Sequence, residues 1–181
     1  MLTKSKTSTA EGKPTQPWGA SGVREQMRAM KREAVLRAAA QIFNEKGFHA
    51  TSLDDVAERL HITKPTLYYY VKNKDEILFE CVSIGLKMLQ DAIGQVAASG
   101  GSAYDKLVAA MQQYAQIVTM DFGMCVIRVG EDPLPVESQR KLRRFKAALD
   151  LEFRELIRQG QAEGSIEIGR ASCRERVLAG V

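Results

Sequence analysis

The feature that most constrains the fold is a pair of helix starts within residues 51–74, TSLDDVAERLHITKPTLYYYVKNK. Thr51 or Ser52 can cap the first helix, and two aspartates follow in its first turn, where the helix dipole favours negative charge. Thr63 can cap the second helix, with Pro65 in its first turn, where the missing N–H costs nothing. The sequence therefore predicts two short helices joined by a tight turn.

Longer helices are predicted on both sides of this pair. Apolar residues recur there every three or four positions, which is the spacing of one helix face. The first short helix ends near Leu60, and DFGMCVIRVGEDPLP is a short helix or an irregular segment. The second short helix is expected over about 64–71, and the longer helices over about 24–46, 75–98, 103–120 and 135–163. The fold class is therefore all-α.

Three adjacent tyrosines, Tyr68, Tyr69 and Tyr70, lie in the second short helix. Consecutive helical residues point about 100° apart, so the three rings cannot all face one core. Leu67 and Val71, four residues apart, are the residues expected to face the core. At least one tyrosine is then left for water or a partner.

The positive charge is concentrated in the N-terminal part of the chain. Residues 1–74 hold thirteen Lys and Arg against seven Asp and Glu, a net of six positive charges. Residues 75–181 hold thirteen against fifteen, a net of two negative charges. A basic head on a mildly acidic body suggests a polyanionic partner, although an ordinary solvated surface explains the same numbers.

Residues 30–79 resemble the DNA-binding head of the TetR family of bacterial transcriptional regulators. The similarity runs through AAAQIFNEKGFHATSLDDVAERLHITKPTLYYYVKNKDEIL in order. It implies an N-terminal three-helix helix-turn-helix head, followed by a C-terminal helical bundle for ligand binding and dimerisation. His61 departs from the family pattern, which often has glycine there. That position implies a positive φ, which histidine tolerates better than most residues.

The resemblance also implies which residues contact double-stranded DNA. In a helix-turn-helix, the second helix of the pair enters the major groove. Tyr68 and Lys74 would then hold phosphates, and Lys64, Thr66 and Tyr69 would lie at or near bases. Tyr70 either joins them or packs against the first helix. The predicted DNA-binding residues are Thr51, Ser52, Lys64, Pro65, Thr66, Tyr68, Tyr69, Tyr70 and Lys74.

The body is expected to form a homodimer in the full-length protein and to bind a small hydrophobic effector. The function implied is a repressor that such a ligand releases from a palindromic operator. The alternative is a DNA-binding activator or architectural factor with no small-molecule ligand. A stripe of this kind is more often plain core, but the candidate pocket residues are Met111, Tyr114, Ile117, Val118, Phe122, Met124 and Phe145.

Four segments are predicted along the chain. Residues 1–23 form a disordered basic tail, 24–74 the head, and 75–166 the effector-binding and dimerisation domain. Residues 167–177, EIGRASCRERV, resemble read-through of a sequencing adapter, so we expect 167–181 to be non-native unless they form a genuine basic tail. Because only one long helix after residue 130 is then available for dimerisation, the bundle is expected to be incomplete and to expose apolar surface.

Several function classes are not supported by the sequence. It offers no nucleophile–base pair, phosphate loop or metal-ligand cluster, so an enzyme, a cofactor and a metal site are not expected. No apolar stretch approaches the ~20 residues of a membrane span. Cys81, Cys125 and Cys173 are odd in number and widely spaced, which is typical of reduced thiols in a cytoplasmic protein.

Overall fold

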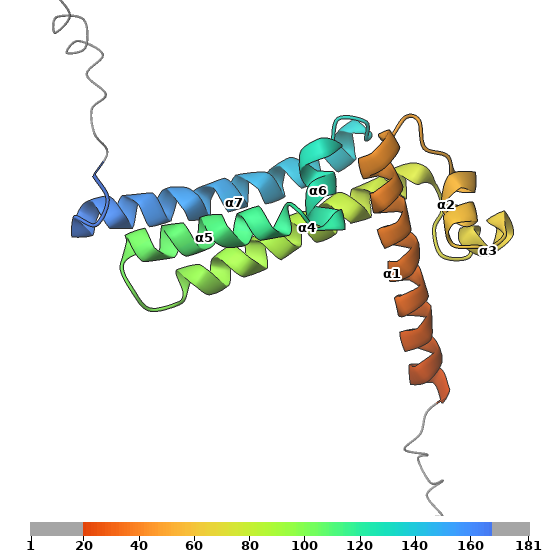
Figure 1. Cartoon of the computed structure of the whole chain (residues 1–181), viewed down its shortest axis with the longest axis horizontal. Coiled ribbons are helices and arrows are strands. Elements are labelled where there is room, and N and C mark those ends of the chain that lie inside the picture. Colours follow the sequence, from red (N-terminus) through yellow and green to blue (C-terminus); the bar gives the residue numbers. More distant parts are fainter. Residues whose placement is uncertain (1–19, 168–181) are drawn as a thin grey trace, which may run out of the picture.

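The computed structural model describes residues 20–167, and this part of the chain is helical without strands. The predictions for the remaining residues, a disordered N-terminal tail and a non-native C-terminal tail, lie outside the described residues. The helices are α1 (Ala20–Lys46), α2 (Leu53–Arg59), α3 (Lys64–Tyr68), α4 (Lys74–Ala97), α5 (Ala103–Ile117), α6 (Asp121–Arg128) and α7 (Val136–Glu163) (Figure 1). The all-α prediction is confirmed.

The helices form a small head and an elongated body (Figure 1). Helices α2 and α3 lie together on one side of α1, and α4, α5 and α7 run side by side away from this head. The N-terminal half of α1 projects beyond the rest of the head. None of the helices in residues 20–167 is both long and apolar enough to cross a membrane.

Two clusters of buried side chains hold the fold together. The larger cluster joins residues of the head, such as Phe43 and Leu67, to residues of the body, such as Cys125 and Leu142. The smaller cluster lies farther along the body, between α4, α5 and α7, and includes Ile93 and Leu156. The head and the near end of the body therefore share one core.

Helix α6 packs against both α1 and α4. Close approach requires glycine at two positions. A Cβ at Gly85 would lie 2.4 Å from the Phe122 carbonyl oxygen, and one at Gly123 would lie 2.0 Å from that of Ile117. On the other side, the buried Asn44 of α1 donates a hydrogen bond of 2.9 Å to the Asp121 carbonyl. Helix α6 thus connects the head to the body.

The helix boundaries follow the predictions to within a few residues. Helix α1 already includes Ala20, four residues before its predicted start. Helix α3 ends at Tyr68 rather than near Val71, because Asn73 caps the next helix by accepting a hydrogen bond from the Glu76 amide. DFGMCVIR is a short helix, and Leu67 and Val71 are buried as predicted.

Candidate nucleic-acid interface

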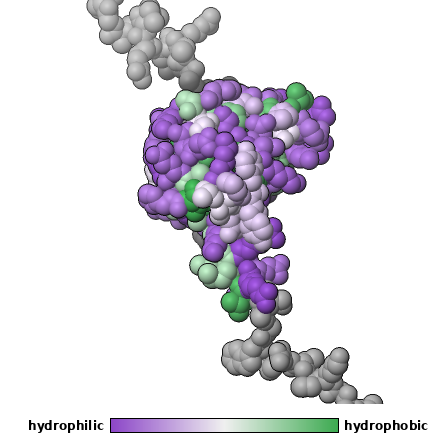
Figure 2. Space-filling view, turned by 90° about the vertical axis from the view of Figure 1, so that its right-hand side faces the viewer, coloured by the Kyte–Doolittle hydropathy of each residue, from purple (hydrophilic) through white to green (hydrophobic). Residues whose placement is uncertain are grey.

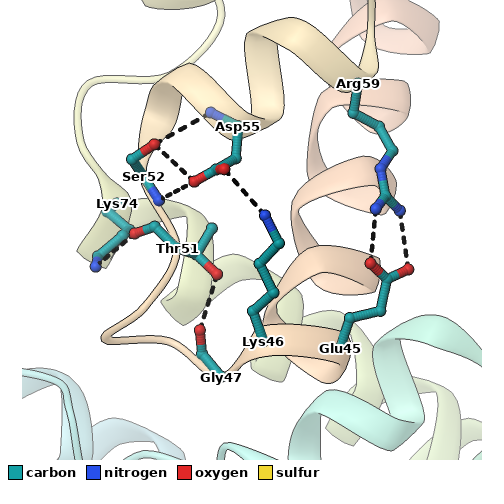
Figure 3. A network of polar contacts seen from close by, with 8 residues as sticks. All are labelled: Glu45, Lys46, Gly47, Thr51, Ser52, Asp55, Arg59 and Lys74. Atoms are coloured by element: carbon teal, nitrogen blue, oxygen red, sulfur yellow. Dashed lines mark hydrogen bonds and ion pairs between the residues drawn. The ribbon is translucent and has the colours of Figure 1, made fainter.

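The N-terminus of α2 is held by a reciprocal cap (Figure 3). The Asp55 amide donates to Ser52 Oγ at 3.1 Å, while the Ser52 amide donates to Asp55 Oδ2 at 2.7 Å. The Ser52 hydroxyl also donates to Asp55, and Lys46 adds a further hydrogen bond of 3.1 Å. Together these bonds, led by that from Ser52, hold the pKa of Asp55 well below its usual range. Ser52 itself stays exposed, as a DNA contact requires.

Two predicted DNA contacts, Thr51 and Lys74, make hydrogen bonds within the protein. Thr51 is only 3% exposed, and its hydroxyl donates to the Gly47 carbonyl at 2.8 Å. The Lys74 ammonium donates to the carbonyls of Phe48 and Thr51 at 2.8 and 2.9 Å and lies 4.3 Å from the Phe48 ring centroid. Both residues therefore brace the loop before α2 (Figure 3). An ammonium has three donors, so Lys74 retains one N–H for another acceptor.

Helix α3 is short and fixed at its first turn. Thr63 caps it by accepting from the Thr66 amide, and the two threonine hydroxyls are 2.8 Å apart. Pro65 lies in the first turn as predicted and is exposed. Lys64 forms an ion pair of 2.9 Å with Asp54 of α2, which raises its pKa. Because both side chains of this pair are exposed, the pair is weak and easily exchanged for another anion.

The three tyrosines separate as helical geometry requires. Tyr68 is 48% exposed and Tyr69 is 63% exposed. Tyr70 is half-buried against the core and meets the Tyr69 ring edge-on, with centroids 5.1 Å apart. Leu67, fully buried on the opposite side, fixes which face of α3 looks outward. Six of the predicted DNA contacts are exposed, one at the N-cap of α2 and five in α3 or at its C-cap. This exposed face consists of Ser52, Lys64, Pro65, Thr66, Tyr68 and Tyr69.

His61 occupies the turn between α2 and α3 with φ of 53°, so the positive φ expected there is confirmed. This conformation lets the Ile62 amide donate to the Ala57 carbonyl at 3.0 Å, which closes the turn. The two helices consequently keep a fixed relation to each other. Within residues 20–167, no three His, Cys, Asp or Glu side chains gather as metal ligands do.

Two arginines of α1 belong to this site and escaped sequence reasoning. The Arg28 guanidinium lies 5.0 Å from the Tyr69 ring centroid. Arg32 donates to the Tyr70 carbonyl at 3.2 Å and forms paired hydrogen bonds with Glu80 of α4. Both contacts join residues about forty positions apart, so local pattern alone does not reveal them; the only available signal was the run of basic residues before an aromatic segment.

The seven residues proposed as effector pocket do not come together in one hollow. Ile117 is buried in the distal cluster, together with the partly buried Tyr114 and Val118. Phe122 is buried in the other cluster and lines grooves beside α1, whereas Met111 is exposed and Met124 half-buried. Phe145 lines a groove of about 430 Å³ between α4 and α7. The stripe is thus mainly helix packing.

Two family models match the chain, one in each half. The model for bacterial regulatory proteins of the tetR family matches residues 35–81, and that for the tetracyclin repressor-like C-terminal domain matches residues 100–181. The first covers α2 and α3 together with the C-terminal part of α1 and the N-terminal part of α4. The match therefore includes every residue of the exposed face described above.

Individual relatives agree with the family models. The HTH-type transcriptional activator FasR of Mycolicibacterium smegmatis is 26% identical over 91 residues, which are 50% of this chain and 42% of FasR. The class D tetracycline repressor protein of Escherichia coli is 40% identical over 52 residues, 29% of this chain and 24% of that protein. The chain thus spans less than half of each of these relatives. One of these relatives is named a transcriptional activator and the other a repressor protein.

A solved structure extends the likeness beyond the head. The TetR family transcriptional regulator PfmR of Thermus thermophilus superposes with a TM-score of 0.67 and 28% identity, over 75% of each chain. Since this overlap is much longer than the head, the body shares the same arrangement of helices. On the two family models and this structural likeness, the chain belongs to the TetR family of bacterial regulatory proteins.

Proposed function

We propose that this protein is a sequence-specific DNA-binding transcriptional regulator that reads the major groove with α3. The observation that carries the proposal is the exposed polar and aromatic face of α3, set opposite the fully buried Leu67. A five-residue helix is marginal in isolation, so its orientation depends on this burial and on the caps at Ser52 and Thr63. Such a rigid, outward-facing helix suits insertion into a groove.

Five of the six residues of the exposed face contact DNA directly in this proposal. Thr66 and Tyr69 lie at base edges, where a hydroxyl bonds and an aromatic ring contacts thymine methyl groups. Lys64 joins them once phosphate or a base replaces Asp54 as its partner. Tyr68 and Ser52 bind backbone phosphates, with Ser52 at the positive end of α2.

Three further predicted residues, which are buried or partly buried, have supporting roles. The remaining N–H of Lys74 reaches a phosphate, while Thr51 acts indirectly by bracing the loop before α2. Tyr70 acts through the ring of Tyr69, which it meets edge-on.

The proposed mode of regulation is release of a repressor from a palindromic operator by a small hydrophobic ligand. A homodimer would place two heads on two half-sites about one helical turn apart. The groove between α4 and α7 is the site that we assign to the ligand, because Phe79, Phe145 and Ala148 give it an apolar lining. FasR is named an activator and the class D protein a repressor, so activation without a ligand is the second candidate.

Selection of bound fragments from a random duplex library tests the DNA-reading function. We expect enrichment of a near-palindromic sequence, and Tyr69→Ala should bind the recovered duplex about tenfold to a hundredfold more weakly. Tyr104→Ala is the matched control, since Tyr104 is 54% exposed but lies on α5. Equal binding by Tyr69→Ala and the unchanged protein would show that α3 does not read the bases.

A thermal-shift screen against small hydrophobic metabolites separates the two modes of regulation. A ligand that binds only the folded state raises the melting temperature, by an amount that grows with its concentration. The repressor proposal expects such a compound and a lower affinity for the recovered duplex in its presence. A ligand that raises the melting temperature without changing DNA affinity would contradict it.

A further inference from the structure

The projecting half of α1 carries a basic face that continues the outward face of α3. Figure 2 looks onto the head and shows this projection at the bottom, with hydrophilic and hydrophobic patches side by side. Residues 22–31 are all exposed, so no part of residues 20–167 covers this segment. Ordering these exposed residues costs conformational entropy that no burial of their side chains offsets. Within residues 20–167, this surface is therefore open to a partner.

Helical geometry places Arg28 and Lys31 on one face together with Val35. At about 100° per residue, these three side chains fall within a sector of about 60°. Val35 is buried against the core of the head, so it fixes the direction of the whole face. Lys31 lies beside α3, because it lines a hollow together with Thr66 and Tyr70. The Arg28 guanidinium carbon lies over the ring of Tyr69, 5.0 Å from its centroid, and Tyr69 is the residue that caps the C-terminus of that helix.

The positive charge on this face is not neutralised by neighbouring acids. Glu33 points elsewhere and forms its ion pair of 2.9 Å with Arg37. Glu25 is close enough along the helix to reach Arg28, three residues on, but among the described residues it forms no ion pair with it. Arg32, by contrast, is turned toward Glu76 and Glu80 of α4. Among the described residues, neither Lys31 nor Arg28 has a hydrogen-bond or ion-pair partner, and Arg28 makes a cation–π contact with the Tyr69 ring.

We propose that Arg28 and Lys31 bind backbone phosphates beside the bases that α3 reads, which makes α1 a second DNA-contacting element. This inference rests on the proposed function. The major groove is about 12 Å wide, so a ring near its centre lies about 6 Å from either wall. A guanidinium 5.0 Å from the centroid of the Tyr69 ring is then within reach of the phosphates that form one wall.

Arg28 has a second role as a positioning residue for Tyr69. A planar guanidinium stacked on a ring restricts the rotamers available to that ring, whereas a lysine ammonium is a point charge on a flexible stem. Arg28→Lys should therefore keep the phosphate contact but loosen Tyr69. The two roles of Arg28 thus predict different changes, one in salt dependence and one in sequence preference.

The test of the phosphate contacts is the salt dependence of binding to a duplex of about 30 base pairs with arbitrary sequence. Each phosphate contact contributes about 0.9 to the slope of log K against log salt concentration. Arg28→Ala with Lys31→Ala should lower the magnitude of that slope by about 1.8. The matched control, Arg154→Ala with Arg158→Ala, removes two exposed arginines at the far end of α7 and should leave the slope unchanged.

The outcomes separate this inference from the proposed function. If the unchanged protein shows no salt-dependent binding, the proposed function fails and this inference with it. If the unchanged protein binds and the Arg28/Lys31 double variant keeps the full slope, only this inference is overturned. All four substituted residues are exposed, so far-ultraviolet circular dichroism should show unaltered folding.

The positioning role is tested with the duplex recovered by selection. Arg28→Lys should keep the slope of the unchanged protein but lose about tenfold of the preference for the recovered duplex over the arbitrary one. If Arg28→Lys retains the full preference, Arg28 binds phosphate without positioning Tyr69. Lys31→Arg, which keeps the charge of a residue that contacts no ring, is the matched control and should change neither quantity.

Discussion

Single side chains with internal partners set the stability of the head, and Lys74 is the clearest example. Its ammonium satisfies the carbonyls of Phe48 and Thr51, two buried residues. Lys74→Met leaves both carbonyls without this donor, so we expect the free energy of unfolding to fall by about 1–3 kcal/mol. Urea denaturation followed by circular dichroism measures this. Lys72→Met, at an exposed neighbour, should change it by less than about 0.5 kcal/mol.

Glu131 gives the body a pH-dependent contribution to stability. Burial raises the pKa of Glu131, but the hydrogen bond from Lys146 and the charges of Lys146 and Arg143 outweigh this and leave the pKa below its ordinary value. A depressed pKa contributes stability above the ordinary value, about 4.3, and this is lost as the pH falls through the folded-state value. Glu131 is therefore stabilising at neutral pH.

Glu131→Gln removes the charge that pairs with Lys146 and Arg143, so the free energy of unfolding should fall by about 1–2 kcal/mol at pH 7. The loss is limited because both cations are partly exposed and keep part of their solvation in the pair. The difference from the unchanged protein should shrink as the pH falls from about 5 to 3. Urea denaturation at several pH values measures this. A difference that stays constant with pH would show that Glu131 acts by packing alone; Glu137→Gln, at an exposed site, is the control.

At single residues, sequence reasoning worked where the cause was local. The burial of Leu67 was predicted from helix geometry, and the positive φ of His61 was predicted because the TetR family often has glycine at that turn position. The inward turn of Lys74 depends on carbonyls more than twenty positions away, and the stacking of Arg28 on Tyr69 depends on how α1 crosses α3. Such contacts need the tertiary arrangement and could not be predicted from local pattern.

Among the helices, α4 contains two glycines with opposite expected effects. A Cβ at Gly85 would meet the Phe122 carbonyl oxygen at 2.4 Å and a Val126 methyl at 2.7 Å, whereas a Cβ at Gly94 would meet nothing within 4 Å. Gly85→Ala should lower the free energy of unfolding by about 1–3 kcal/mol, because α6 must move away. Gly94→Ala should raise it by about 0.5–1 kcal/mol through reduced backbone entropy of the unfolded chain.

Thermal and urea denaturation of the two variants, compared under the same conditions, check this pair. If Gly85→Ala is as stable as Gly94→Ala, α6 is not packed tightly against α4 and cannot couple the head to the body. The existence of the helices and the caps at Ser52 and Thr63 were predictable because these signals act locally. The close packing of α6 on Gly85 could not be predicted, because a glycine inside an amphipathic pattern does not indicate which helix packs against it.

On the scale of the whole molecule, the shared core predicts that the head does not unfold separately from the near end of the body. Helices of five and seven residues are not stable alone, so α2 and α3 depend on the cluster that also contains Cys125 and Leu142. One cooperative transition is expected for a core of this kind. The distal cluster is smaller and joins the same helices α4 and α7, so it should follow the same transition.

Leu67→Ala in the head and Leu156→Ala in the distal body test this cooperativity. Both side chains are almost fully buried, and each variant should lose about 2–5 kcal/mol, with a single transition shifted to lower urea. In both, hydrogen exchange of α3 and α7 amides should accelerate together. If Leu67→Ala accelerates exchange in α3 but leaves α7 protected as before, the head opens locally, and α3 would reach DNA from a flexible rather than a fixed position. Leu151→Ala, at a residue of α7 that is 60% exposed, should change neither quantity.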